Sequence, residues 1–275
     1  MKYLITGGTG TFGRALTDRL ISFEDATEIR IFSRDEAKQH DMMQEITDSR
    51  VKYFIGDVRN RESLKEPMRG VDYVFHAAAM KHVWSCEQFP LEAFATNVTG
   101  TANTIDAAIE AGVKKYILLS SDKAVYPVGV MGATKFLAER VLLSKMFNTT
   151  TTMYGVRFGN LINSRGSVVG VWRKQLSKGR SCAMTDPSAT RFIMTIEQAL
   201  DLVERVFHND EPGEIKIYEA KACTVRDLFI AVTGTNDNYR IIGLQPGEKK
   251  HEWLTEELCS EDAERFTIDE LRAML

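Results

Sequence analysis

The chain has 275 residues, 44% of them hydrophobic, which is enough for one large core or a core with a smaller lobe. Its 35 Lys and Arg residues nearly balance its 38 Asp and Glu residues, and a net charge of -3 argues against a nucleic-acid-binding protein, which usually carries a basic face. No run approaches the roughly 20 apolar residues of a membrane span, and no apolar leader follows Met1, so we expect a cytoplasmic protein without a membrane span.

Short apolar runs alternate with helical patterns through the first half of the chain. Strands are predicted at residues 3–6, 29–32, 51–55, 73–76, 116–119 and 152–156. Helices are predicted between them at residues 14–23, 93–111 and 132–146, the second ending at Gly112. This alternation is typical of a parallel sheet covered by helices on both faces. We therefore predict an α/β fold with a Rossmann-type doubly wound sheet.

The pattern loosens after Arg157, where glycine, serine and arginine become frequent. We predict a dinucleotide-binding Rossmann domain at residues 1–158 and a smaller substrate-binding lobe at residues 159–275. Residues 215–218 read as a strand that returns to the main sheet, so the boundary is not clean.

A glycine-rich loop separates the first predicted strand from the first predicted helix. Its GxxGxxG spacing lets the backbone approach a pyrophosphate, and the helix N-terminus offers free N–H groups to the anion. A plain glycine turn is the alternative interpretation, and the position at the start of a βαβ pattern speaks against it. The cofactor-binding residues predicted here are Gly7, Thr9, Gly10, Thr11, Phe12 and Gly13.

The end of the second predicted strand normally contacts the adenosine ribose, where an acid favours NAD and a basic residue favours NADP. Ser33 and Arg34 stand there with Lys38 just beyond, whereas Asp35 comes one position too late to be the usual acid. We therefore predict NADP in preference to NAD, the alternative being a solvated charged loop. Further cofactor contacts are expected at Asp57 and Val58 beside the adenine, and at Ala77, Ala78 and Asn97.

Cysteine and histidine spacing gives no sign of a disulfide framework or a metal site. The four cysteines form no CxxC pair, and the five histidines form no HxxxH pair. We expect free thiols and no bound metal.

The most informative segment runs from Ser120 to Lys135. It resembles the active-site strip of extended short-chain dehydrogenases, in which a Ser or Thr at a strand end and a YxxxK motif on the next helix flank the nicotinamide. Lys135 lies one helical turn after Met131, so the two share a helix face. Met131 takes the tyrosine position, and methionine cannot accept a proton, so the usual general base is missing.

Taken over most of its length, the chain resembles the UDP-N-acetylglucosamine 4,6-dehydratases of bacterial polysaccharide synthesis, several of which carry methionine in the tyrosine position. The resemblance lies in residues 7–13, 31–36, 79–83, 121–125, 160–168, 185–187, 190–192 and 246–249. It implies that NADP+ oxidises C4 of the sugar, that a base then removes the acidified C5 proton while O6 leaves as water, and that the hydride returns to C6.

The resemblance also implies roles for individual residues. Lys123 would be the C5 base, which requires a lowered pKa, and Asp122 would be the acid for O6, which requires a raised pKa. Ser121 would hold the C4 hydroxyl, and Lys135 would bind the nicotinamide ribose. The acceptor of the C4 hydroxyl proton stays open between Tyr126 and a water relayed through Ser121. A surface ion pair is the alternative interpretation of Asp122 and Lys123.

A UDP-sugar carries two phosphates, so its pocket should contain cations. By resemblance Arg191 contacts the diphosphate, whereas Gln245 stands where the family often has arginine. The other expected substrate contacts are Lys81, Asn160, Ser167, Val168, Thr185 and Glu248. The resemblance further implies a homo-oligomer, at least a dimer, and inversion at C5.

Two other classes remain open at this point. An epimerase or reductase on the same fold would share most of these motifs, because fold does not determine function. A non-catalytic nucleotide-binding protein is suggested by Met131 alone.

Overall fold

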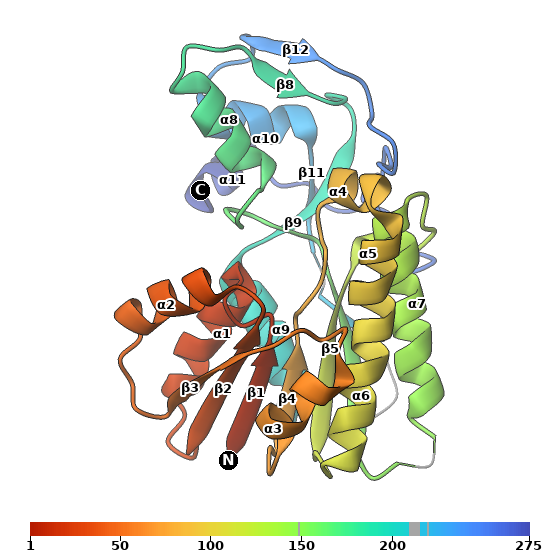
Figure 1. The fold of residues 1–275 in the computed structure, drawn as a ribbon. Coiled ribbons are helices and arrows are strands. Elements are labelled where there is room, and N and C mark those ends of the chain that lie inside the picture. Colours follow the sequence, from red (N-terminus) through yellow and green to blue (C-terminus); the bar gives the residue numbers. More distant parts are fainter. Residues whose placement is uncertain (148, 209–214, 219) are drawn as a thin grey trace.

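A seven-stranded parallel sheet forms the centre of the molecule in the computed structural model, which describes residues 1–147, 149–208, 215–218 and 220–275 (Figure 1). The strand order is β10-β6-β5-β4-β1-β2-β3, and every pairing is parallel. The strands are β1 (Lys2–Thr6), β2 (Glu28–Ser33), β3 (Val51–Ile55), β4 (Tyr73–His76), β5 (Lys115–Ser121), β6 (Thr152–Phe158) and β10 (Ile215–Ile217). This arrangement confirms the predicted doubly wound α/β fold.

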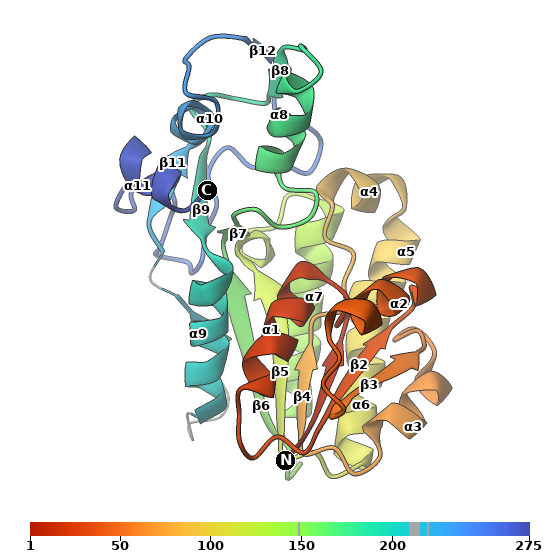
Figure 2. The same ribbon diagram turned by 90° about the vertical axis from the view of Figure 1, so that its left-hand side faces the viewer.

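Helices cover both faces of the sheet, as the nearly continuous apolar strands require. On one face lie α1 (Thr11–Ile21), α2 (Glu36–Glu45) and α9 (Ile196–His208), and on the other lie α3 (Lys65–Met68), α6 (Gly100–Glu110) and α7 (Val130–Lys145). Figure 2 shows α9 beside α1, although the two are far apart in the chain. The ring of Phe207 on α9 packs edge-on against Tyr73, with 4.7 Å between ring centroids.

The predicted helix at residues 93–111 is interrupted by a π-helical turn. It consists of α5 (Pro90–Phe94), the turn η2 (Ala95–Thr99) and α6. The side chain of Asn97, inside that turn, binds both backbone groups of Met80 in a neighbouring loop. Single π-helical turns of this kind are frequent at functional sites.

The smaller lobe stands at the carboxyl ends of the strands, with its own apolar core around Trp172 and Phe229, whose rings meet edge-on at 5.3 Å (Figure 1). It contains two small sheets, ordered β11-β9-β7 and β12-β8. Its elements are β7 (Asn160–Leu161), α8 (Val168–Leu176), β8 (Cys182–Met184), β9 (Thr190–Met194), β11 (Ala222–Thr224), α10 (Val225–Thr233), β12 (Tyr239–Ile241) and α11 (Ile268–Ala273). The short helices α4 (Val83–Gln88), η1 (Arg61–Leu64) and η3 (Asp122–Ala124) complete the described elements.

The segment predicted to return to the main sheet does so. Ile215 of β10 pairs with Gly155 of β6 in parallel register. Helix α9 also packs on the main sheet. Residues of the predicted substrate-binding lobe, 159–275, therefore contribute both to the core of the main sheet and to the core of the smaller lobe.

Two chain-wide features complete the description. All four cysteines are free and buried. Within the described ranges, no helix is long and apolar enough to cross a membrane.

Candidate active site

A cavity of about 550 Å³ lies between the sheet and the smaller lobe. Its walls come from the carboxyl ends of β5 and β6 and from β9 and α8, which is where open α/β sheets place ligands. All seven residues predicted to contact substrate line it, namely Lys81, Asn160, Ser167, Val168, Thr185, Arg191 and Glu248. The fold therefore brings together side chains from widely separated parts of the sequence, and their contact with a substrate stays a prediction.

The glycine-rich loop has the geometry that a pyrophosphate needs. Gly7 has φ +67°, and a Cβ placed there would lie only 2.7 Å from the backbone nitrogen of Ala78, so the position requires glycine. Gly10 is the N-cap of α1, and Thr11 and Phe12 begin the first turn, whose N–H groups have no intrahelical acceptor. The loop thus fits the diphosphate of a nicotinamide dinucleotide.

At the end of β2, the carboxylate of Asp35 is used as a helix cap. Asp35 caps α2 by accepting a hydrogen bond from the backbone N–H of Lys38 at 3.0 Å, and its carboxylate also pairs with the Lys38 ammonium. Ser33 is buried, and its hydroxyl oxygen accepts a hydrogen bond from Gln39 at 3.0 Å. The ammonium of Lys38, which was predicted to contact the cofactor, is therefore already paired with the carboxylate of Asp35.

Arg34 is the exposed cation at this strand end. Its side chain is 51% exposed and lies 3.6 Å from the carboxylate of Asp57. Burial would raise the pKa of Asp57, but its hydrogen bonds with Arg59 and the charge of Arg34 outweigh burial and lower it. Val58 is buried, and its carbonyl accepts a hydrogen bond from the Asn103 side chain at 3.0 Å.

The remaining predicted cofactor residues divide into two groups. The backbone N–H groups of Ala77 and Ala78 are held by Thr6, at 3.1 and 3.3 Å, which positions the chain beside the glycine loop. Asn97 is 1% exposed and donates both amide hydrogens within the protein, to Met80 O and to Thr134 Oγ1, at 3.0 and 2.9 Å. Asn97 therefore holds the loop that carries Met80, and its contact with the cofactor stays a prediction.

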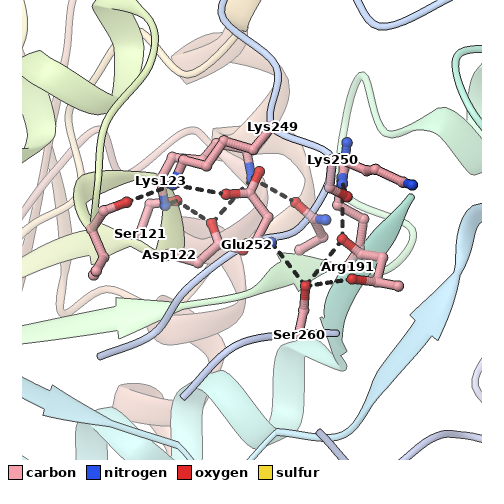
Figure 3. Close-up of polar contacts among 11 residues, drawn as sticks. Ser121, Asp122, Lys123, Arg191, Lys249, Lys250, Glu252 and Ser260 are labelled. Atoms are coloured by element: carbon pink, nitrogen blue, oxygen red, sulfur yellow. Dashed lines mark hydrogen bonds and ion pairs between the residues drawn. The ribbon is translucent and has the colours of Figure 1, made fainter. Parts of the chain in front are cut away.

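Ser121, Asp122 and Lys123 form a polar cluster at the cavity (Figure 3). Ser121 ends β5, and its hydroxyl donates to Asp122 Oδ1 at 2.8 Å. The ammonium of Lys123 lies 3.0 Å from the same oxygen and 3.3 Å from Asn160 Oδ1. Asp122 is fully buried, whereas Ser121 and Lys123 line the cavity, so the pair is not a surface ion pair.

Glu252 joins this cluster, and the sequence analysis missed it. Its Oε1 lies 3.2 Å from Lys123 Nζ, and its Oε2 lies 3.2 Å from Lys249 Nζ. Lys249 also donates to Val125 O at 2.5 Å. The one sign of Glu252 in the sequence was its position three residues after Lys249, which ends the segment 246–249 that contributes to the resemblance.

The charges of this cluster set the protonation of its members. Burial raises the pKa of Asp122, as its predicted role requires. Burial would lower the pKa of Lys123, but the carboxylates of Asp122 and Glu252 outweigh burial and raise it. The lowered pKa that a base role for Lys123 requires is therefore not present in the resting cluster, because Glu252 adds a second carboxylate. Burial opposes the charge of Glu252, and the cations Lys123, Lys249 and Arg191 prevail and lower its pKa.

Met131 and Lys135 lie on the first turns of α7 and line the same cavity. Lys135 donates to Leu119 O at 2.7 Å, and burial lowers its pKa to about 8, which keeps it mostly protonated at neutral pH. Gly132 packs directly on the carbonyl oxygen of Lys123, where a Cβ would overlap that oxygen. The start of α7 thereby fixes the backbone that carries Lys123.

The two candidates for accepting the C4 hydroxyl proton differ in position. Tyr126 is 53% exposed, and its ring packs edge-on against Trp253, with 5.4 Å between centroids. Ser121 lines the cavity and contacts Asp122. The geometry therefore favours the route through Ser121.

Gln245, at the position where the family often has arginine, is turned toward its own loop. Its side-chain amide donates to Ile242 O and Gly243 O at 3.4 and 3.1 Å, and its backbone N–H donates to the carboxylate of Glu248 at 3.0 Å. Arg191 donates to Thr190 O and Lys250 O at 2.8 and 3.0 Å.

Within the described part of the chain, His, Cys, Asp and Glu side chains form no group of three or more suited to a metal ion.

Comparison with known proteins relates the whole chain to a known family. A family profile described as polysaccharide biosynthesis protein matches residues 3–271. The UDP-glucose 4-epimerase of Rickettsia akari (strain Hartford) is 44% identical over 268 residues, which are 94% of this chain and 78% of the relative. The solved structure of Pen from Bacillus thuringiensis is 36% identical, with a TM-score of 0.92 over 99% of this chain and 96% of Pen. DesIV, a dTDP-glucose 4,6-dehydratase from Streptomyces venezuelae, shares the fold at 19% identity, with a TM-score of 0.87 over 100% of this chain and 95% of DesIV.

Proposed function

Since the chain belongs to the polysaccharide biosynthesis protein family and has the extended short-chain dehydrogenase/reductase fold, we propose that it is a UDP-N-acetylglucosamine 4,6-dehydratase. Curated relatives of the chain are named UDP-glucose 4-epimerases, and a dTDP-glucose 4,6-dehydratase shares its fold. The observation that carries the proposal is the pairing of a buried acid with a lysine at the cavity, next to a methionine in the tyrosine position. An elimination needs an acid and a base together, and Asp122 and Lys123 offer both groups 3.0 Å apart.

The cavity fits a series of reaction steps in which the sugar is first oxidised at C4. Bound NADP+ would supply a reversible hydride carrier, which would take a hydride from C4 in this step and give it to C6 after water has left. Lys135 and the loop around Gly7 would hold the nicotinamide ribose and the diphosphate. A ketone at C4 acidifies the neighbouring C5–H, so a weak base near C5 is sufficient for the next step.

Lys123 and Asp122 become base and acid by an internal proton transfer. At rest the pair is an ammonium and a carboxylate, and one proton moves from Lys123 Nζ to Asp122 across 3.0 Å. The resulting amine removes the C5 proton, the carboxylic acid protonates O6, and water leaves with both C–O bond electrons. The Lys123 ammonium then returns a proton to the opposite face of C5, which inverts that carbon.

Ser121 closes the proton balance of the cycle. The C4 hydroxyl proton is released during the oxidation, before Asp122 has given up its own proton, so it passes through Ser121 Oγ to solvent water. Once O6 has left and C5 is reprotonated, the pair is one proton short, and Asp122 regains that proton from solvent water through Ser121 Oγ, 2.8 Å away. Met131 takes no part in proton transfer in this scheme.

We also propose NADP as the cofactor, inversion at C5 and a homo-oligomeric assembly of at least two chains. For NADP the supporting observation is that Arg34 is exposed at the end of β2, where a 2′-phosphate would lie, while Asp35 is used as a helix cap. Inversion and assembly rest on the resemblance alone.

A 4-epimerase is the second candidate, because relatives 44% identical to this chain carry that name. Incubating the protein with UDP-N-acetylglucosamine and, separately, with UDP-glucose distinguishes the two by product NMR. A 4-keto-6-deoxy sugar supports dehydration, a C4 epimer supports epimerisation, and unchanged substrate would leave a nucleotide-binding protein. Carrying out the reaction in heavy water reports C5 exchange and its stereochemistry.

Two variants separate the roles inside the site. Lys123→Ala is expected to abolish turnover while cofactor binding survives, because Lys123 supplies the base. Met131→Phe is expected to retain far more activity, because Met131 has no proton to exchange. Equal loss of activity in the two variants would contradict the assigned roles.

A further inference from the structure

Glu252 reaches the acid–base cluster from a segment that lies far along the chain from Asp122 and Lys123. We propose that Glu252 is a positioning residue of this centre, which holds the Lys123 ammonium on the side opposite Asp122 and so sets the pH range in which Lys123 works as a base. The inference rests on the proposed dehydratase function and adds to it a residue that neither the sequence motifs nor the resemblance identified.

Three side-chain oxygens surround the ammonium of Lys123, and Figure 3 shows those of Asp122 and Glu252. Asp122 Oδ1, Glu252 Oε1 and Asn160 Oδ1 lie 3.0, 3.2 and 3.3 Å from Nζ. They come from η3, from the segment before the C-terminal helix and from β7. A lysine held by three separate segments has a fixed head group, and its direction toward the cavity depends on all three.

The carboxylate of Glu252 is itself held in place. Glu252 is 2% exposed, its backbone N–H donates to Ser260 Oγ at 2.8 Å, and Lys249 Nζ lies 3.2 Å from Oε2. Two residues along, Leu254 O accepts a hydrogen bond from Arg157 at 2.9 Å. The segment is therefore fixed on both sides of Glu252, and a change at Glu252 acts on Lys123 without releasing the segment.

The charges around Lys123 determine the sign of the effect. Asp122 on η3 and Glu252 favour the ammonium, and Arg191 on β9 disfavours it. Lys249 faces Glu252 on its other side and keeps it ionised. Removing the Glu252 charge therefore lowers the proton affinity of Lys123, so that the neutral amine forms at lower pH.

The matched variants are Glu252→Gln, Glu252→Asp and Glu256→Gln. The first removes the charge with little change in volume, and the second keeps a carboxylate but withdraws it from Nζ. The third makes the same chemical change at an exposed position four residues further along the chain. Glu252→Asp also serves if Glu252→Gln does not fold.

Two measurements are needed, one of which is independent of turnover. Competitive acetylation with acetic anhydride across a pH series, read by peptide mass spectrometry at Lys123, gives the midpoint of its titration, since the 19% exposed side chain admits a small reagent. The second is the pH profile of kcat for formation of the 4-keto-6-deoxy product from UDP-N-acetylglucosamine. Both midpoints should move to lower pH by about one unit or more in Glu252→Gln, the shift expected for a unit charge 3.2 Å away even at the dielectric constant of water. Glu252→Asp should move them less, and Glu256→Gln should leave them in place.

The outcomes separate the two proposals. An unmoved acetylation midpoint in Glu252→Gln, or in Glu252→Asp if only that variant folds, overturns the role of Glu252. A moved acetylation midpoint together with an unmoved pH profile of kcat also overturns the role of Glu252, because a residue that only supports the structure would lower kcat equally at every pH. If the wild-type protein forms no 4-keto-6-deoxy product, the proposed function fails, and the acetylation midpoint alone still decides whether Glu252 controls the protonation of Lys123.

Discussion

His76 gives a direct test of how strongly the core beneath the glycine loop excludes charge. The ring is fully buried at the end of β4, between Thr6 and Thr101, at 2.7 Å from Nδ1 and 3.0 Å from Nε2. The Thr101 hydroxyl already donates to Asn97 O at 2.6 Å, so its oxygen must accept from Nε2–H. Nδ1 then accepts from the Thr6 hydroxyl, and the neutral ring is satisfied on both sides.

Protonation of His76 would place a charge in this site without a counter-ion. Burial, together with the positive charge of Lys135, lowers the pKa of His76 from its ordinary value of 6.5 to about 3. The unfolded chain takes up a proton near its ordinary pKa and the folded chain does not. Stability is therefore fully present above the unfolded pKa and is lost as the pH falls from there toward the folded pKa.

Replacing His76 by glutamine should remove this loss, because the amide has no proton to gain and can still donate to Thr101. From the two pKa values, wild-type protein should lose about 2 kcal/mol of unfolding free energy through His76 between about pH 7.5 and pH 5. His76→Gln should be destabilised by a constant amount and should lack this component. Urea unfolding of both proteins at the two pH values measures the difference, and identical pH dependence in the two would refute a neutral His76 in the folded state.

Three further changes test other parts of the structure. Gly7→Ala should weaken cofactor binding and lower stability by about 1–3 kcal/mol, since its φ of +67° and the close backbone of Ala78 leave no room for a methyl group; calorimetry and NADPH fluorescence measure the two effects. Arg157→Met should cost about 3–5 kcal/mol of unfolding free energy, because it leaves the 2% exposed carboxylate of Glu139 without its 2.7 Å partner, and adding Glu139→Gln should recover part of it. Arg34→Ala should reduce the preference for NADP over NAD by about tenfold or more in paired titrations, the loss expected for a charge-assisted contact to phosphate.

The sheet was predictable because its strands are short apolar runs with sharp polar or glycine boundaries. The predicted strands at 51–55 and 73–76 have the same bounds as β3 and β4, and the return of 215–218 to the sheet was also foreseen. The π-helical turn at Ala95–Thr99 was not predictable, since it accompanies contacts between Asn97 and the backbone of a separate loop. Periodicity within one helix carries no information about such partners.

The candidate site also contains residues that could be predicted from the sequence and one, Glu252, that could not. Ser121, Asp122 and Lys123 are neighbours in sequence at a strand end, so their clustering at the cavity follows from the strand alone. Glu252 lies in a stretch rich in charged residues, where one buried glutamate looks like its exposed neighbours. Only the path of the backbone brings it to Lys123, and with it comes the charge that raises the pKa of Lys123.

A ribosome releases β6 well before it releases α9 and β10. Until those later elements emerge, the outer hydrogen-bonding edge of β6 has no partner strand, and the apolar face that will hold Phe207 against Tyr73 is open to water and to other nascent chains. The same surfaces would be bare in a gene fragment ending near residue 158. A stand-alone dinucleotide-binding half would therefore need α9 and β10 grafted back onto it before it could be expected to remain monodisperse.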